Sequence, residues 1–354
     1  MRVGLRQISF SLSLLSVIFL FSSCSLMSRN SKTDKSLELV NQKGWQELLP
    51  ILIESGFERE EALALLIDPR MPSFTNYEFK LKPVESKDLY KGVSSKKRLS
   101  SLEACYLQHS QSLKNAEERF GVSDKIVVSI LEIESGCGKN SGKEVLFYRL
   151  ARLANAGNAS NIEFNILKNI NEINPDTNKA YIEKELNEKF KARGDKLRSM
   201  FVPELKAVVE LAKNLGVHPL EVKGSYGGAL GYFQFLPSNV LKLGVDGSGD
   251  GKVDPYNIDD AIFSIANYFK HHGWSNNLTV KKQREVVWAY NHSDAYIDSV
   301  LFFRDHLDSA SRKKLRKGKP VNEKPVNKKL ANKKLAKKSQ PKNSANNKLE
   351  KISR

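Results

Sequence analysis

Apolar residues recur every three or four positions through most of the chain between residues 44 and 308, a spacing typical of amphipathic helices. No segment shows the regular alternation of apolar and polar residues that indicates β-strands. We therefore expect a mainly α fold. The segments with the clearest helical spacing are 45–54, 60–67, 102–120, 123–134, 203–215, 259–272 and 281–290.

Three stretches depart from this pattern. Residues 158–200 are rich in Asn, Lys and Glu and poor in apolar anchors, which predicts a helical insertion or a long surface loop. Residues 309–354 repeat Lys-Pro-Val-Asn and Asn-Lys-Lys-Leu-Ala, a low-complexity pattern that predicts a disordered tail. Residues 24–43 are polar and predict a tether, so the packed domain is expected over 44–308.

The positive charge lies mostly in the tail. The 354 residues carry a formal net charge of +17, and residues 312–354 hold 17 Lys or Arg against Glu323 and Glu350. The rest of the chain is therefore close to neutral, which argues against a nucleic-acid-binding core. The tail is either a solvated extension or a segment that binds anionic polymers of the cell envelope weakly.

The N-terminus predicts export. Two arginines precede an apolar run over 8–21, as in a signal peptide over 1–23, and the run is short for a membrane span. The segment Leu20-Phe21-Ser22-Ser23-Cys24 resembles the lipobox at which bacterial lipoproteins are cut and acylated on the cysteine. The resemblance implies a lipid anchor on Cys24 at the periplasmic face of the outer membrane. A cleaved secretory peptide, which would give a soluble periplasmic or secreted protein, is the alternative.

Two further cysteines remain, Cys105 and Cys137. Disulfides form outside the cytoplasm, and this pair would close a loop of about 32 residues worth ~3 kcal/mol. Two buried free thiols are the alternative.

The helix expected over 123–134 carries two carboxylates that spacing distinguishes. Glu134 lies above Ile130 and Leu131 on the apolar face, whereas Glu132 lies on the more polar face. Apolar surroundings desolvate a charged carboxyl, raise its pKa and leave it a proton to donate near neutral pH. We therefore predict that Glu134 is a general acid and that Glu132 is a solvated surface residue.

Glycines cluster between residues 224 and 231. Lys223 precedes them and no Gly-Lys-Ser/Thr follows, so the block is not a Walker phosphate-binding loop. Small residues instead let the backbone approach a bulky ligand such as a sugar chain.

Residues 246–257 match the front of an EF-hand calcium loop, with oxygen donors at positions 1, 3, 5 and 7 and glycine at position 6. Position 12 is Asn257 instead of a bidentate Glu, so calcium affinity is expected to be low, about 10⁻⁴ to 10⁻³ M. Asn257 suits the N-cap of the next helix equally well. The predicted ligands of a structural calcium ion are Asp246, Ser248, Asp250, Lys252 through its carbonyl, and Asn257.

Several blocks of the chain, in order, resemble the membrane-bound lytic transglycosylase B family. The resemblance covers roughly residues 44–308 and implies a lysozyme-like, mainly helical fold. Its blocks are Glu134-Ser135-Gly136-Cys137-Gly138, the run from Lys223 to Ser238, Asp246 to Gly251, Gly273-Trp274, and Tyr290 to Tyr296.

The resemblance also implies a reaction on peptidoglycan glycan strands by a monomer, with no cofactor needed for the chemistry. Glu134 would protonate the oxygen between N-acetylmuramic acid and N-acetylglucosamine, then remove the proton of the C6 hydroxyl, so that a 1,6-anhydro end forms without water. Some of the tyrosines below have a plainer alternative, as core residues with a satisfied hydroxyl. The residues expected to contact saccharide are Ser225, Tyr226, Tyr232, Gln234, Tyr268, Tyr290, Asn291 and Tyr296.

Two features depart from the family pattern. Gly136-Cys137 stands where the family usually has Arg-Trp, and the 158–200 stretch is longer than expected. The alternatives to a lytic transglycosylase are a hydrolytic muramidase on the same fold and a non-catalytic peptidoglycan-binding lipoprotein.

Overall fold

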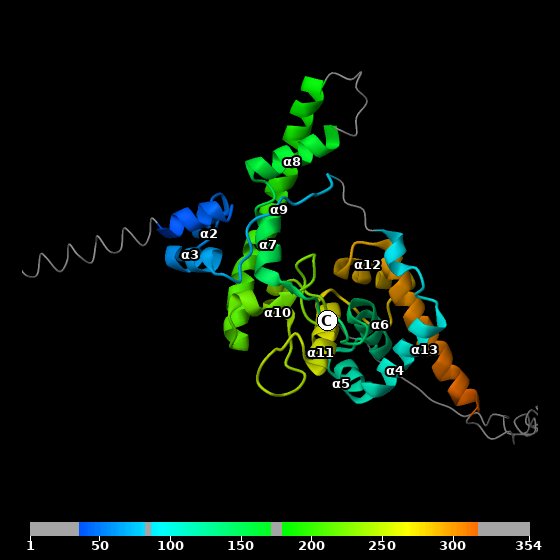
Figure 1. Cartoon of the computed structure of the whole chain (residues 1–354). Coiled ribbons are helices and arrows are strands. Elements are labelled where there is room, and N and C mark those ends of the chain that lie inside the picture. Colours follow the sequence, from blue (N-terminus) through cyan, green and yellow to red (C-terminus); the bar gives the residue numbers. More distant parts are fainter. Residues whose placement is uncertain (1–34, 82–85, 171–178, 318–354) are drawn as a thin grey trace, which may run out of the picture. The chain divides into compact units, whose positions relative to one another are not determined.

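The computed structural model describes residues 35–81, 86–170 and 179–317 (Figure 1). The chain divides into two compact units at Asp308–Ser309. The elements are α2 (Leu48–Glu54), α3 (Arg59–Ile67), the 3₁₀ helix η1 (Lys87–Tyr90), α4 (Lys96–Gln108), α5 (Ser110–Phe120), α6 (Asp124–Ser135), β1 (Glu144–Val145), α7 (Leu146–Ala154), α8 (Ala159–Ile170), α9 (Lys179–Leu215), η2 (Pro219–Glu221), β2 (Lys223–Gly224), α10 (Pro237–Leu243), α11 (Ile258–His271), α12 (Val280–Tyr290) and α13 (Asp294–Lys317).

The predicted mainly α fold is confirmed, because helices account for most of the described residues. The segment 102–120 is two helices, since α4 ends at Gln108 and α5 begins at Ser110, with His109 between them. In the described part of the chain, the named strands are two residues each. They pair antiparallel with Glu144 opposite Gly224 and so join the loop after α6 to the Gly-rich block.

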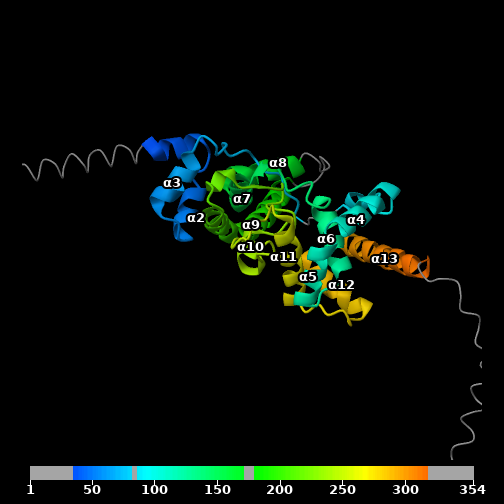
Figure 2. The ribbon, with the colours of Figure 1, turned by 90° about the horizontal axis from the view of Figure 1, so that it is seen from below.

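The insertion expected over 158–200 is helical in its described residues. It consists of α8 and the first part of α9, which pack side by side (Figures 1 and 2). Pro203, which the sequence placed at a helix start, lies inside the 37 residues of α9. The segment preceding η1 is held along α8 by two buried asparagines. Asn161 Oδ1 accepts from Tyr77 N at 2.6 Å, and Asn165 Oδ1 accepts from Phe79 N at 3.1 Å.

One part of the core forms where α11 packs on α5 and α6 and α4 covers another face of α6, and another part forms where α7 packs on α9. Its largest fully buried side chains include Trp45, Phe233, Phe269 and Tyr296. Among the described residues, none of the helices has the length and apolar character needed to traverse a lipid bilayer.

The structure differs from two predicted boundaries, the end of the N-terminal tether and the start of the disordered tail. Residues 35–42 are helical and Val40 is fully buried, so the tether expected up to residue 43 cannot include them. Residues 309–317 continue helix α13. The prediction that the whole tail from residue 309 onward is disordered is therefore wrong for these residues. The signal peptide, Cys24 and residues 318–354 lie outside the described residues.

Candidate active site

Helix α6 positions Glu134 near its C-terminal end. Ser123 occupies the N-cap position, although its side chain makes no capping hydrogen bond. Gly136 ends the helix in the left-handed region at φ 60°, which glycine adopts at low cost. Glu134 therefore stands one turn from a sharp change in chain direction.

Glu134 borders a cavity of 450 Å³. The hydroxyl of Tyr296 donates a hydrogen bond to Glu134 Oε1 at 2.5 Å, and the Tyr296 side chain is 1% exposed. The lining thus combines one carboxyl, one amide and two cations with aromatic and aliphatic side chains. The lining residues are Leu89, Tyr90, Lys91, Val93, Arg98, Ile133, Glu134, Asn291 and Tyr296.

Tyr290 and Tyr296 form a stacked pair with ring centroids 6.2 Å apart. Burial raises the pKa of both hydroxyls well above the ordinary value, and the charge of Glu134 raises each pKa further. The two groups are therefore protonated donors at physiological pH. Tyr296 donates to Glu134, whereas Tyr290 donates to the carbonyl of Phe233 in the Gly-rich region.

Glu132 is buried, contrary to the sequence prediction of a solvated surface residue. It is 1% exposed because α4 packs on the face of α6 that the sequence showed as polar. Burial raises the pKa of Glu132, and Arg98 and Ser101 act in the opposite direction. Arg98 Nη1 lies 3.6 Å from Glu132 Oε1, so this arginine reaches both the buried carboxyl and the cavity.

The Gly-rich block lies directly against the loop that follows Glu134. A Cβ built on Gly142 would lie 2.1 Å from the carbonyl of Gly224, so the two backbones approach closer than any side chain permits. Gln234 donates from Nε2 to Gly231 O at 2.7 Å and to Ser141 O at 3.4 Å. These contacts hold the block beside the C-terminal end of α6.

The predicted saccharide residues divide into three groups. Tyr290, Asn291 and Tyr296 gather around Glu134. Ser225 makes reciprocal hydrogen bonds with the backbone of Ala229, and Tyr232 packs on Tyr256, so both belong to the Gly-rich block. Tyr226 is 59% exposed on the same block, whereas Tyr268 is 6% exposed and donates to Ala289 O, which fits the core alternative.

Sequence reasoning missed the segment over 89–93 and Arg98, which complete the cavity. Tyr90 packs edge-on against Tyr296, with ring centroids 6.0 Å apart. The segment has no helical periodicity long enough to draw attention, and nothing in its spacing relates it to α6 or α13.

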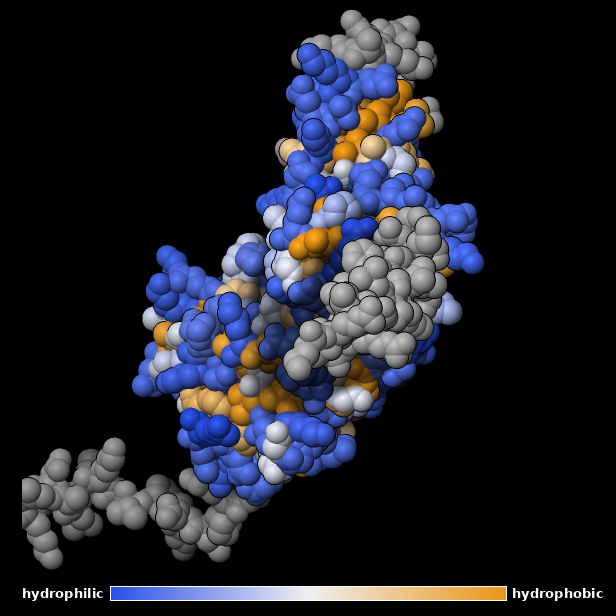
Figure 3. Space-filling view, turned by 90° about the vertical axis from the view of Figure 1, so that its left-hand side faces the viewer, coloured by the Kyte–Doolittle hydropathy of each residue, from blue (hydrophilic) through white to orange (hydrophobic). Residues whose placement is uncertain are grey.

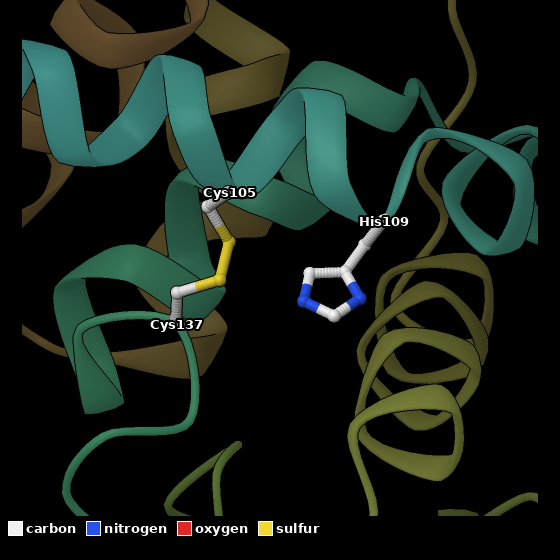
Figure 4. Close-up of side chains that lie close together, drawn as sticks. All are labelled: Cys105, His109 and Cys137. Atoms are coloured by element: carbon white, nitrogen blue, oxygen red, sulfur yellow. A yellow bond between two sulfur atoms is a disulfide. The ribbon is translucent and has the colours of Figure 1, made fainter.

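Cys105 and Cys137 form a disulfide with Cα atoms 5.9 Å apart (Figure 4). The bond joins α4 to the turn after α6, three residues beyond Glu134. His109 ends α4 beside it, and its ring nitrogen and the two sulfurs lie within 4.8 Å of one another. Since the sulfurs are bonded to each other, they are not thiolates that could bind a metal.

The 246–257 loop fits calcium only in its front half. Asp246 accepts from Gly249 N at 2.6 Å and Gly251 N at 2.8 Å, a closed turn in which these backbone hydrogen bonds lower the pKa of Asp246. Asn257 Oδ1 instead caps α11 by accepting from Asp259 N and Asp260 N. The fully buried Asp260 accepts from three backbone N–H groups of the loop, those of Gly247, Ser248 and Asp254.

A larger hollow of 830 Å³ lies between α8 and α9 and contains none of the predicted site residues. Its lining includes Ile162, Ile166 and Leu167, the last 53% exposed. Figure 3 shows apolar surface on the part of the molecule formed by α8 and α9, toward the top of the view. The smaller cavity at Glu134 is the better active-site candidate because it contains an acid with a hydrogen-bonding partner.

The described chain is thus a mainly helical scaffold with one glutamate in a cavity lined by polar and aromatic side chains. The chain belongs to the family described as "Transglycosylase SLT domain", whose model matches residues 41–286, and the family predicted from the sequence is confirmed.

Known relatives agree with this family. Membrane-bound lytic murein transglycosylase B of Escherichia coli (strain K12) is 32% identical over 167 residues, which are 47% of this chain and only 36% of that protein. The E. coli lytic transglycosylase SLT35 in complex with bulgecin A has a TM-score of 0.54 and 19% identity, covering 75% of this chain and 92% of that chain. Soluble lytic transglycosylase SltB1 from Pseudomonas aeruginosa has a TM-score of 0.54 and 21% identity, covering 75% and 99%. The two structures establish the likeness of the fold.

Proposed function

We propose that the chain is a lytic transglycosylase that cleaves the β-1,4 bond between N-acetylmuramic acid and N-acetylglucosamine in peptidoglycan. The observation that carries the proposal is Glu134 itself, which borders a cavity and accepts a hydrogen bond from Tyr296. The resemblance of the Glu134–Gly138 motif to the family supports the same residue. The E. coli relative is named a lytic murein transglycosylase, which supports the proposal.

Glu134 acts twice in this proposal. Its proton passes to the glycosidic oxygen as the C1–O bond breaks, and positive charge develops at C1 of the muramic acid. The resulting carboxylate removes the proton of the C6 hydroxyl, whose oxygen bonds to C1 and closes the 1,6-anhydro ring. The product ends therefore contain no atom from water, and Glu134 ends protonated again.

Tyr296 supports both steps from the side of α13. Its O–H donates to Glu134 Oε1, so this hydrogen bond stabilises the carboxylate that forms after proton transfer. Tyr290, Asn291 and the Gly-rich residues Ser225, Tyr226, Tyr232 and Gln234 supply aromatic and polar surface for the sugars. Tyr268 supports Tyr290 from the core, with ring centroids 5.0 Å apart.

Digestion of purified sacculi, with mass spectrometry of the products, tests the function. Anhydromuropeptides are expected from the wild type and not from Glu134→Gln. Glu132→Gln is the matched control, since it changes the same group two residues away on α6 and should keep the products. Reducing ends from the wild type would instead identify a hydrolytic muramidase, and no products at all would favour a non-catalytic binding protein.

For location, we propose an exported lipoprotein that acts as a monomer and is anchored through Cys24 at the periplasmic face of the outer membrane. The lipobox-like sequence supports it, and the E. coli relative is named membrane-bound. Radiolabelled palmitate incorporated by the wild type and not by Cys24→Ala would test the anchor. Incorporation by both proteins would contradict it.

We also propose weak calcium binding by the 246–257 loop in a structural role, since SLT35 has been solved in complex with calcium. Asp246, Ser248, Asp250 and the Lys252 carbonyl are the donors, and Asn257 contributes little while it caps α11. Millimolar calcium should raise the thermal midpoint of the wild type slightly and that of Asp246→Asn not at all.

A further inference from the structure

The turn that follows Glu134 contains a cysteine in a backbone conformation that favours glycine. Gly136, Cys137 and Gly138 have φ values of 60°, 63° and 77° in succession. A residue with a Cβ is unfavourable in this left-handed region and persists there only where its surroundings impose it. Among the described residues, Gln234 is the other non-glycine residue with a positive φ, and it lies in the loop that packs beside this turn.

A covalent bond holds the turn in this conformation. The disulfide joins Cys137 to Cys105 on α4, whereas the backbone N–H of Cys137 makes only a long hydrogen bond of 3.3 Å to Leu131 O. Arg98 lies seven residues before Cys105, on the same face of α4, and lines the cavity at Glu134. The disulfide therefore fixes both the turn after the acid and one wall of its cavity.

The turn is also packed against the Gly-rich block. A Cβ built on Gly138 would lie 3.1 Å from Ile258 Cδ1 and 3.4 Å from the ring of Tyr232. Three residues after Gly138, the carbonyl of Ser141 accepts from Gln234 Nε2. A change in the turn at residues 136–138 is consequently passed on to the loop proposed to hold the sugars.

The disulfide is placed where a thiol can reach it. Cys105 is 2% exposed, but Cys137 is partly exposed, and exchange needs access to one sulfur only. His109 lies one turn after Cys105, on the same side of α4 as the disulfide, and its ring nitrogen is within 4.8 Å of both sulfurs (Figure 4). Burial lowers the pKa of His109 and Asp259 opposes this, so the imidazole is a neutral base at physiological pH.

We propose that Cys105–Cys137 is a site of thiol–disulfide exchange at which a dithiol inactivates the enzyme and reoxidation restores it. A thiolate of the dithiol bonds to Cys137 Sγ, and Cys105 leaves as a thiolate that takes up a proton. The second thiol of the reductant then displaces Cys137, so the reductant ends as a disulfide and the chain gains two electrons and two protons. His109 exchanges protons between the thiols and water. The inference rests on the proposed function, since the activity that changes is that of Glu134.

Sacculus digestion by the full chain tests the switch. The rate of anhydromuropeptide release is measured before reduction, after dithiothreitol, and after reoxidation with oxidised glutathione, well below the thermal midpoint of every sample. Reduction should lower the rate about tenfold or more, because the acid and the cavity wall lose their fixed alignment, and reoxidation should restore it. The double variant Cys105→Ser with Cys137→Ser should be slow and should respond to neither reagent.

Two variants separate the switch from a loss of stability. Leu66→Ala empties a fully buried position on α3, which contributes no residue to the Glu134 cavity, and it should lower stability comparably while keeping the oxidised rate. His109→Gln should slow both reduction and reoxidation about tenfold, as followed by mass spectrometry of alkylated Cys105 and Cys137. An unchanged digestion rate after complete reduction, an equal loss in Leu66→Ala, or wild-type exchange rates in His109→Gln would overturn the proposal.

Amide hydrogen exchange keeps this test distinct from that of the proposed function. Oxidised wild-type protein that releases no anhydromuropeptides would contradict the proposed function alone. Reduction should still speed amide exchange in residues 136–142 and 223–235 and leave α3 unchanged, because the disulfide holds the first loop and the first loop holds the second. Exchange that is unchanged in both loops would overturn the switch whatever the enzyme cleaves.

Discussion

At the scale of single residues, the chemistry depends on how one carboxyl is held. Glu134 is reached by the hydroxyl of Tyr296, which comes from a helix more than 150 residues later in the chain. Tyr296 is itself buried and stacked on Tyr290, so its hydroxyl has little freedom to turn away. The carboxyl is therefore oriented by a donor that packing has already fixed.

Tyr296→Phe should remove this donor and keep the ring packing. We expect kcat on sacculi to fall about tenfold or more, because the carboxylate loses a hydrogen bond worth about 1.5–3 kcal/mol. Release of anhydromuropeptides measures the rate, and thermal denaturation checks the fold. Tyr290→Phe is the comparison, since its hydroxyl bonds Phe233 O and not Glu134. Equal rate losses in both variants would contradict a specific role for Tyr296.

Glu132→Gln should stabilise the chain at neutral pH. Burial raises the pKa of Glu132, so the folded state retains a proton that the unfolded state has lost at pH values above about 4.5. The wild type consequently loses stability as pH rises through that window, and the amide variant does not. We expect the variant's thermal midpoint to exceed the wild type's by roughly 2–4 °C at pH 7.5, with the gap closing near pH 4.5. A gap that is constant with pH would contradict this account.

The sequence prediction for Glu132 is wrong, whereas the catalytic role of Glu134 stays a prediction. Helical spacing and the family motif selected Glu134, which borders the cavity. The same spacing placed Glu132 in water, because a helix seen alone does not reveal that α4 covers its polar face. Tyr268 failed similarly, since a tyrosine's residue type does not say whether its hydroxyl meets a ligand or a backbone carbonyl.

At the scale of elements, the disulfide ties α4 to the turn that follows the active-site helix. Replacing both cysteines, Cys105→Ser with Cys137→Ser, should lower the free energy of unfolding by about 3 kcal/mol, because the unfolded chain regains the freedom of a loop of about 32 residues. Urea denaturation measures the loss.

A reductant provides the control for the disulfide. Dithiothreitol should lower the stability of the wild type toward that of the double variant and should not affect the double variant. A wild type that is unchanged after complete reduction would show that the bond adds no stability.

The helices themselves were mostly predictable, since strong 3.6-residue periodicity marks α6, α11 and α12. Two misplacements have a physical reason. The sequence predicted a helix start at Pro203, because proline lacks the backbone N–H that a position inside a helix would donate. Helix α9 nevertheless continues through Pro203, supported by its packing on α7, α8 and α10. The insertion over 158–200 was hard to interpret because α8 buries two asparagines, Asn161 and Asn165, where an apolar pattern would show hydrophobic residues.

At the scale of the whole molecule, the positively charged tail and the buried apolar side chains occupy different parts of the sequence. Residues 318–354 carry 12 Lys or Arg against Glu323 and Glu350. Among the residues whose burial the structure describes, the last buried apolar side chain is Leu307. Deleting 318–354 should therefore leave the thermal midpoint and sacculus digestion unchanged. It should abolish salt-sensitive retention on polyglutamate and polyphosphate resins, which column elution measures. A lower thermal midpoint after deletion would contradict the separation.

The contact between Gly142 and Gly224 limits how the sequence of such an enzyme can change over generations. A side chain at position 142 would meet backbone atoms of the Gly-rich block, so no compensating mutation of a neighbouring side chain could make room for it. Substitutions at the contact between the two loops are thus excluded, whereas exposed residues of the Gly-rich block, such as Tyr226, can change without disturbing that contact. Selection for a new glycan preference would therefore act on those side chains and leave the framework that aligns them with Glu134 intact.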